Sequence, residues 1–315
     1  MARAGGLRGN LPAMEKAVRA GYRSEGLTPG IVESFHRFLA LFYRQKGRDL
    51  PWRRTTDPYH ILVSEFMLQQ TQVERVLVKY PEFLGRFPDV EALARAPVQE
   101  VLLAWQGLGY NRRALALHRT ARRIAEEFHG EVPLDRATLD SFPGIGSATA
   151  GAIVVFSTNR PEIFIETNIR RVYIHLFFPG AEKVHDREIG PLLEKTLDRE
   201  RPRRFYHTLM DYGSLLKRGT GDPNGPLLKK GTGNPNLRSA SYARQTPFEG
   251  SDRQVRGIVL RELLGRGEIA DEGLGERLSV EPGRLERILR GLERDGFIVR
   301  GGGRIRCREN MERSG

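Results

Sequence analysis

Two glutamates stand in settings that could support acid–base chemistry. Glu65 lies within LVSEFMLQQTQV (62–73), and Glu166 lies within FIETNIRRV (164–172), at the expected start of an apolar helix. If residues 60–79 form one helix, Glu65 lies at the edge of its apolar stripe, where partial desolvation would raise its pKa. Such an acid can protonate a leaving base near neutral pH, while a second carboxylate stabilises a developing oxocarbenium ion.

Each glutamate also has a purely structural interpretation. Glu65 could pair with an arginine such as Arg112 or Arg113, and Glu166 could be a first-turn acid favoured by the helix dipole. The stretch LDSFPGIGSATAGAI (139–153) predicts a helix, a tight glycine hairpin and a second helix, whose backbone N–H groups can hold a phosphate. The hairpin and the two carboxylates together indicate an enzyme that cleaves an N-glycosidic bond in DNA.

The lysines and cysteines limit the chemistry further. No lysine occurs between Lys79 and Lys183, and Ala148 stands at the hairpin position where an imine-forming lysine would sit. The sequence therefore predicts hydrolysis that leaves an intact strand with an abasic site. The single cysteine, Cys307, excludes an intramolecular disulfide and a clustered-thiolate metal site, so we expect no metal and no cofactor.

The composition indicates a soluble protein with a polyanionic partner. The chain has 315 residues, 39% hydrophobic and 29% charged, and a formal net charge of +12. Residues 201–256 carry eleven Lys and Arg against four Asp and Glu, whereas residues 257–315 carry twelve against eleven. A basic solvated surface is the alternative. No apolar run approaches the ~18–20 residues that span a bilayer, and no signal-peptide pattern opens the chain, so a cytoplasmic, nucleoid-associated monomer is expected.

Helical periodicity dominates from Thr28 to about Ser214, with prolines between the periodic stretches. This pattern predicts an all-α domain with helices over 31–46, 60–79, 91–105, 112–128, 137–142, 147–157, 168–178 and 187–198. Two domains with flanking segments are expected, namely a mobile basic arm (1–28), the all-α domain (29–214), a basic Gly/Pro/Asn-rich linker (215–250), a second domain (251–309) and a tail (310–315).

The linker and the second domain have distinct patterns. LLKRGTGDPNGP and LLKKGTGNPNLR form a tandem repeat over 215–238, which is either a flexible linker or a basic loop lying along DNA. From Ser251 three amphipathic helices, the third with Pro282 in its first turn, precede two short strands joined by glycines 301–303. This is a winged-helix pattern, in which the third helix commonly enters the major groove. Protein docking is the alternative, and contact with DNA is favoured.

Several stretches resemble one family. They are DLPWRRTTDPYHILVSEFMLQQTQVERV (49–76), AWQGLGYNRRALALH (104–118), FPGIGSATAGAI (142–153), IETNIRRV (165–172) and LMDYGSLLK (209–217). Over residues 36–214 the chain resembles the helix-hairpin-helix (HhH-GPD) DNA glycosylase superfamily, and within it the MutY-type adenine glycosylases. The resemblance implies that Glu65 is the general acid and that Glu166 takes the place of the catalytic aspartate.

The resemblance also implies which residues meet the duplex. Gln70 matches the glutamine wedged in at the flipped base. The expected DNA-binding residues are Gln69, Gln70, Thr71, Asn111, Arg112, Gly144, Ile145, Gly146, Ser147 and Thr149. The expected base-pocket residues are Trp52, Arg53, Trp105 and Tyr110.

Four departures from the family pattern are present. Glutamate replaces aspartate at position 166, and the four-cysteine iron–sulfur loop is missing where the repeat stands. Asn111 replaces the second tyrosine of the GLGYY motif, and a winged helix replaces the usual 8-oxoguanine-checking domain. We expect a monofunctional glycosylase of double-stranded DNA that releases adenine opposite guanine or 8-oxoguanine. A mismatch thymine or uracil glycosylase, and a non-catalytic binder of damaged DNA, are the alternatives.

Overall fold

The computed structural model describes residues 10–218, 233–244 and 246–308, which form two compact units. The first unit contains the described residues of 10–56 and 146–244, and the second those of 57–145 and 246–308. Within the predicted hairpin, the chain leaves the second unit and enters the first between Ile145 and Gly146. In the part of the chain that the structure describes, no helix has the length and apolarity needed to cross a membrane.

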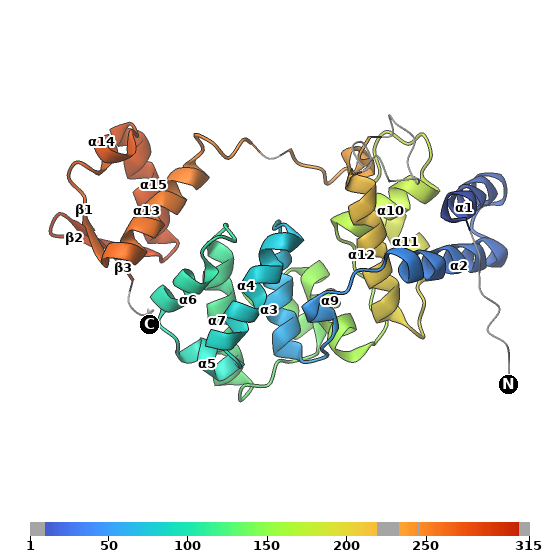
Figure 1. The fold of residues 1–315 in the computed structure, drawn as a ribbon, viewed down its shortest axis with the longest axis horizontal. Coiled ribbons are helices and arrows are strands. Elements are labelled where there is room, and N and C mark those ends of the chain that lie inside the picture. The colour runs from blue at the N-terminus through green and yellow to red at the C-terminus, as the bar shows by residue number, and fades with distance from the viewer. Residues whose placement is uncertain (1–9, 219–232, 245, 309–315) are drawn as a thin grey trace. The chain divides into compact units, whose positions relative to one another are not determined.

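The first unit is all-helical in its described residues. It comprises α1 (Leu11–Glu25), α2 (Pro29–Lys46), the short 3-10 helix η1 (Pro51–Arg53), α9 (Ser147–Thr158), α10 (Thr167–Phe177), α11 (Asp186–Thr196), α12 (Pro202–Arg218) and η2 (Pro235–Arg238). Helix α10 packs along α12, and α1 packs along α2 (Figure 1). The Phe35 ring lies in the core of this unit, 5.4 Å from Phe177 and 6.3 Å from Phe205 between centroids.

The second unit has a helical part and a C-terminal segment. The helical part comprises α3 (Pro58–Leu68), α4 (Val73–Arg86), α5 (Val90–Arg95), α6 (Val98–Trp105), α7 (Arg112–Glu127) and α8 (Arg136–Asp140). The C-terminal segment (252–308) comprises α13 (Asp252–Arg266), β1 (Glu268–Ala270), α14 (Leu274–Leu278), α15 (Pro282–Arg294), β2 (Ile298–Gly301) and β3 (Arg304–Cys307).

The C-terminal segment has the element order expected of a winged helix. Its antiparallel sheet has the order β1-β3-β2, with α13 and α15 packed on it (Figure 1). Gly302 and Gly303 have φ of 58° and 71°, which suits the two-residue hairpin between β2 and β3. The sequence pattern missed β1, because three residues are too short to show alternation.

The expectation of a mobile arm was wrong for residues 11–25. Helix α1 begins at Asn10, whose side chain accepts from the Ala13 N–H, and it buries Leu11, Glu15 and Val18. These positions follow helical spacing, but the middle one is a carboxylate, so the apolar stripe is interrupted. The Glu15 carboxylate is buried because it hydrogen-bonds His175 Nε2 at 2.6 Å.

Two predicted helices are each broken in two. The 60–79 helix divides at residues 69–72, where Gln70 has a φ of 53°. The 91–105 helix divides at Ala96, which is extended in front of Pro97. Proline disfavours the helical conformation of the residue before it, so the helix ends here. The apolar periodicity continues past this boundary, which is why the sequence predicts a single helix.

The tandem repeat is only partly a linker. Residues 215–218 complete α12, residues 219–232 lie outside the described part of the chain, and 235–238 form η2 against α10. Arg238 donates to the carbonyl oxygens of Phe178 at 2.7 Å and Ala181 at 3.1 Å. The Arg238 guanidinium is therefore committed to carbonyl oxygens at the end of α10, and contact of the repeat with DNA stays a prediction.

Gly213 tests the packing of α12 on α10. A Cβ at this position would lie 2.2 Å from the Asn168 carbonyl oxygen, a backbone atom that cannot move aside cheaply. We expect Gly213→Ala to lower the free energy of unfolding by at least about 3 kcal/mol. Gly257→Ala is the control, since a Cβ there meets open space within α13 and should stabilise by about 0.5–1 kcal/mol. Urea unfolding measures both, and equal effects would contradict this packing.

Candidate active site

Glu65 lies on α3, a helix buried along most of its length. The Asp57 side chain accepts from the His60 N–H at 3.0 Å to begin the helix, with Pro58 in its first turn. The chain neighbours of Glu65, Ser64 and Phe66, are buried, and Glu65 itself is half-buried. Glu65 is thus half-buried on a largely buried helix that ends at Leu68, and its role as an acid stays a prediction.

A buried arginine of α7, Arg113, caps the end of α3. Its Nη1 donates to the carbonyl oxygens of Phe66 at 2.8 Å and Met67 at 3.0 Å, and to that of Gln69. The last carbonyl groups of a helix find no hydrogen-bond donors within the helix. Here the Arg113 guanidinium supplies those donors. The chain therefore turns after Leu68 instead of continuing as a helix.

The same guanidinium holds the loop that precedes α7. Its Nη2 donates to Thr71 Oγ1 at 2.9 Å and to the carbonyl oxygens of Leu108 at 3.2 Å and Gly109 at 3.0 Å. Its central carbon lies 5.4 Å from the Trp105 ring centroid and 5.5 Å from that of Tyr110. Two loops with predicted DNA-binding residues are thus fixed by one side chain.

We call this group the Arg113 clamp, consisting of Arg113 and the bonded oxygens of Phe66, Met67, Gln69, Thr71, Leu108 and Gly109. Arg113 is only 9% exposed, and desolvation lowers its pKa to about 10, so it stays charged at neutral pH. No sequence pattern indicates this role, because backbone carbonyl acceptors carry no side-chain signature.

The glycine hairpin is attached to the same part of the second unit. Gln69 Nε2 donates to the Gly144 carbonyl at 3.1 Å, and Thr120 Oγ1 donates to that of Pro143 at 3.1 Å. Gly144 has a φ of 78°, and a Cβ there would come within 2.9 Å of Phe66. Only glycine suits this position, so the hairpin lies close to α3. The structure thus brings together Gln69, Thr71 and Gly144, three of the predicted DNA-binding residues.

In the first unit, α9 begins directly after the hairpin. Its N-cap, Gly146, supplies no side-chain hydrogen bond, and Gly146 and Ser147 are exposed. Thr149 and Ala148 are half-buried in the first turn. A helix start that lacks a side-chain cap and is exposed to solvent can present backbone N–H groups to an anion. Binding of a DNA phosphate by these N–H groups stays a prediction.

Glu166 is the N-cap of α10. Its Oε1 accepts from the N–H groups of Asn168 at 2.8 Å and Ile169 at 3.2 Å, and its Oε2 accepts from Asn168 Nδ2 at 3.3 Å. The structural alternative for Glu166 is therefore present, and it does not exclude a catalytic role. Capping fixes the carboxylate and directs two helix N–H groups at one of its oxygens.

A second glutamate cap in the chain shows what burial does to Glu166. Glu281 caps α15 in the same way, accepting from the N–H groups of Gly283 and Arg284, and these bonds lower its pKa in solvent. Burial instead raises the pKa of Glu166, and the amides of Asn168 and Ile169 only partly offset it. The carboxylate of Glu166 is thus a poorly solvated anion when ionised.

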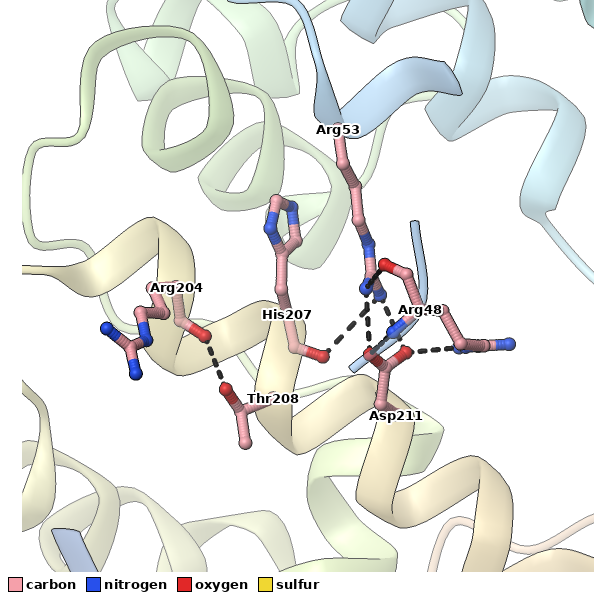
Figure 2. A network of polar contacts seen from close by, with 6 residues as sticks. All are labelled: Arg48, Arg53, Arg204, His207, Thr208 and Asp211. Atoms are coloured by element: carbon pink, nitrogen blue, oxygen red, sulfur yellow. Dashed lines mark hydrogen bonds and ion pairs between the residues drawn. The ribbon is translucent and has the colours of Figure 1, made fainter. Parts of the chain in front are cut away.

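Asp211 organises a polar network in the first unit (Figure 2). Its carboxylate accepts two hydrogen bonds from Arg53, both at 2.8 Å, and one from Arg48 Nε at 2.6 Å. Burial alone would raise the pKa of Asp211, but the hydrogen bonds and charges of Arg53 and Arg48 outweigh it and lower the pKa. Desolvation lowers the pKa of His207 to about 3, so this ring is neutral.

The structure revises two predicted base-pocket residues. The guanidinium of Arg53 is committed to Asp211 and its side chain is only 8% exposed, so it ties residues 48–53 to α12. Trp105 is fully buried against Phe83, and its indole N–H donates to the Gly109 carbonyl at 3.2 Å. Both side chains are thus committed to structural contacts within their own units.

The remaining predicted site residues differ in their exposure to solvent. Trp52 is buried in η1, while Gln70 and Tyr110 are exposed at left-handed φ values of 53° and 50°. Ile145 is buried in the hairpin, and Asn111 is half-buried before α7.

Arg112, the exposed first residue of α7, pairs with Asp295 at 2.8 Å.

An iron–sulfur cluster does not fit this chain. The sequence contains one cysteine, where a cluster requires four thiolates. Cys307 is buried in β3, and burial raises the pKa of its thiol, which disfavours the thiolate.

Residues 63–195 match the HhH-GPD superfamily of base excision DNA repair proteins. An adenine DNA glycosylase of Mycobacterium tuberculosis is 34% identical over 276 residues, covering 83% of this chain and 89% of its own. The chain belongs to the HhH-GPD superfamily of base excision DNA repair proteins, which confirms the family resemblance. An adenine DNA glycosylase of Buchnera aphidicola is 36% identical over 58% of this chain, which spans about half (52%) of that relative.

Solved structures support the fold. A thermostable thymine-DNA glycosylase superposes with a TM-score of 0.53 at 25% identity, covering 62% of this chain and 90% of its own. A trapped covalent endonuclease III–DNA intermediate gives a TM-score of 0.50 at 20% identity over 58% of this chain and 85% of its own. These likenesses confirm the helix-hairpin-helix fold.

The Arg113 clamp can be tested by removing its charge. Arg113→Met leaves the buried carbonyls without donors, so the free energy of unfolding should fall by at least about 3 kcal/mol. Arg113→Lys should not rescue it, because an ammonium has three donors and no planar fork. Arg122→Met on the same helix is the control and should cost less than about 1 kcal/mol. A small effect of Arg113→Met in urea unfolding would contradict the clamp.

Proposed function

We propose that this protein is a monofunctional DNA glycosylase that hydrolyses the N-glycosidic bond of adenine mispaired with guanine or 8-oxoguanine. The observation that carries the proposal is Glu166, a half-buried carboxylate fixed by two helix N–H groups within the IETN motif. The similarity to adenine DNA glycosylases along 83% of the chain supports adenine as the base. Double-stranded DNA is the partner, and the protein acts as a monomer.

The proposed chemistry needs two carboxylates in opposite protonation states. Glu65, half-buried on apolar α3, protonates the departing base as a general acid. Glu166, as an anion, stabilises the positive charge that develops on the sugar before water adds. The amides at the start of α9 hold a phosphate of the same strand, and exposed Gln70 fills the space left by the flipped nucleotide.

Release of a mismatched thymine or uracil is the second candidate. The likeness to a thermostable thymine-DNA glycosylase, which covers 90% of that chain, favours it. The same two carboxylates would serve this reaction, so they do not by themselves select between adenine and thymine or uracil.

A panel of duplexes tests the proposal. The protein is incubated in excess with duplexes carrying A·G, A·8-oxoG, T·G or U·G, and alkali-labile sites are measured over time. The proposal predicts rapid product only from the two adenine duplexes. Product from T·G or U·G alone would establish the second candidate, and tight binding without product would show a non-catalytic binder.

The pH dependence of base release tests the state of Glu166. Glu166 must be ionised, and burial raises its pKa, so the anion is lost as the pH falls through that raised value. The single-turnover rate should therefore decline on the acid side at a pH above the ordinary glutamate value of 4.5. A rate that stays level down to that value would show that Glu166 is not the titrating anion.

Borohydride trapping tests the absence of a covalent imine. Ala148 is half-buried in the first turn of α9, and the chain has no lysine from 80 to 182. Reduction during turnover should therefore give no protein–DNA crosslink, and the strand should stay intact until alkali is added. Ala148→Lys provides a comparison that introduces the amine at the hairpin. A strong crosslink with the unaltered protein would overturn the monofunctional assignment.

A further inference from the structure

The chain between α9 and α10 (159–166) forms neither helix nor strand, and Glu166 stands at its end. Backbone N–H and C=O groups in such a segment need hydrogen-bond partners from elsewhere in the fold. Tyr206 of α12 serves two of these groups, because its hydroxyl donates to the Glu162 carbonyl oxygen at 2.7 Å and accepts from the Phe164 N–H at 3.5 Å. One side chain therefore holds the backbone just before Glu166.

The Phe164 side chain fixes the same segment against α9. Its ring stacks on that of Tyr206, with the centroids 4.1 Å apart and 25° between the planes, and both residues are buried. A Cβ at Gly151 of α9 would lie 2.9 Å from the Phe164 Cβ, so the absence of a side chain at Gly151 allows this close approach. The segment is thus packed between α9 and α12, which belong to the same unit.

Helix α12 also contacts the chain just after Glu166. Gly213 lies against the Asn168 carbonyl, where a Cβ would come within 2.2 Å of the oxygen. Gly213 follows Tyr206 by about two turns of the helix, so both residues face the same side of α12. One face of α12 therefore braces the chain both before and after Glu166.

This bracing fixes the Glu166 carboxylate relative to the start of α9. The amides of Asn168 and Ile169 tie the carboxylate to α10, and Tyr206 ties the beginning of α10 to α9 through Phe164. The N–H groups at the start of α9 are those expected to hold a DNA phosphate, and Glu166 is the group expected to face the sugar. A displacement of about 1 Å between two such groups can lower the rate about 100-fold.

We infer that Tyr206 is a positioning residue, which holds Glu166 at its working distance from the start of α9. The effect on base release rests on the proposed function, whereas the bracing of the 159–166 segment does not. Because Tyr206 is fully buried, it acts through Glu166 and not on the substrate. The hydroxyl is essential to this role, since without it the Glu162 carbonyl and the Phe164 N–H lose the partner that they share.

Single-turnover base release by Tyr206→Phe tests the inference, because phenylalanine keeps the stacked ring and removes only the hydroxyl. The rate on an A·8-oxoG duplex should fall about tenfold or more, while the Kd for the duplex stays within about twofold. Tyr173→Phe is the matched control, since Tyr173 of α10 is equally buried and its hydroxyl bonds Thr196 Oγ1 at 2.5 Å. The control should keep its rate. An unchanged rate in Tyr206→Phe, or an equal fall in both variants, would overturn the inference.

A double-mutant cycle tests whether the ring and the hydroxyl act on one segment. Phe164→Leu keeps an apolar side chain against α9 and removes the stacked ring. Each single variant should slow base release about tenfold, and the double variant should be little slower than the slower single variant. Losses that multiply would show independent effects and overturn the inference.

Hydrogen exchange without DNA separates this inference from the proposed function. The amides of Asn168 and Ile169, which Glu166 caps, should exchange about tenfold faster or more in Tyr206→Phe than in Tyr173→Phe. Equal exchange in the two variants would overturn the inference, and if Tyr206→Phe does not fold, Phe164→Leu takes its place. If the unaltered protein releases no base from any duplex, the proposed function fails, and this exchange still decides whether Tyr206 holds Glu166.

Discussion

The buried charge of Arg113 is the constraint on which the second unit depends. One guanidinium, 9% exposed, satisfies oxygens at the end of α3 and in the loop before α7. Burying a cation is unfavourable unless its donors are used, so these oxygens must stay where they are. The end of α3 is therefore fixed three residues after Glu65. The same bonds fix Gln69 and Thr71, and Gln69 in turn holds the Gly144 carbonyl.

Glu166 of the first unit is a helix cap whose charged form is disfavoured by desolvation. The same two-amide cap lowers the pKa of exposed Glu281, whereas desolvation outweighs it at half-buried Glu166 and raises the pKa. An anion kept partly desolvated interacts strongly with a positive charge that forms nearby, because little water competes for it. Gly213 of α12 admits the Asn168 carbonyl and so allows α10 to pack closely on α12.

The sequence predicted the fold class, most helices and the placement of Glu166 at a helix start. It did not predict α1, because a stripe whose middle member is Glu15 lacks apolar periodicity. It did not predict the break after Leu68, because the cause is Arg113, 45 positions further along the chain. The family resemblance predicts Arg53 and Trp105 at a base pocket, but it does not predict that Arg53 binds Asp211 or that Trp105 donates to the Gly109 carbonyl. Local patterns thus predict elements, and contacts between distant residues decide which side chains remain available.

The most direct test of the central claim, that Glu65 is the acid, is single-turnover base release by Glu65→Gln. The amide keeps the shape and polarity of the side chain but cannot donate a proton as a carboxylic acid does. Release of adenine from an A·8-oxoG duplex should be abolished while the Kd for the duplex stays within a few-fold, and Glu100→Gln, an exposed change on α6, should retain full activity. Retained base release by Glu65→Gln would contradict the account.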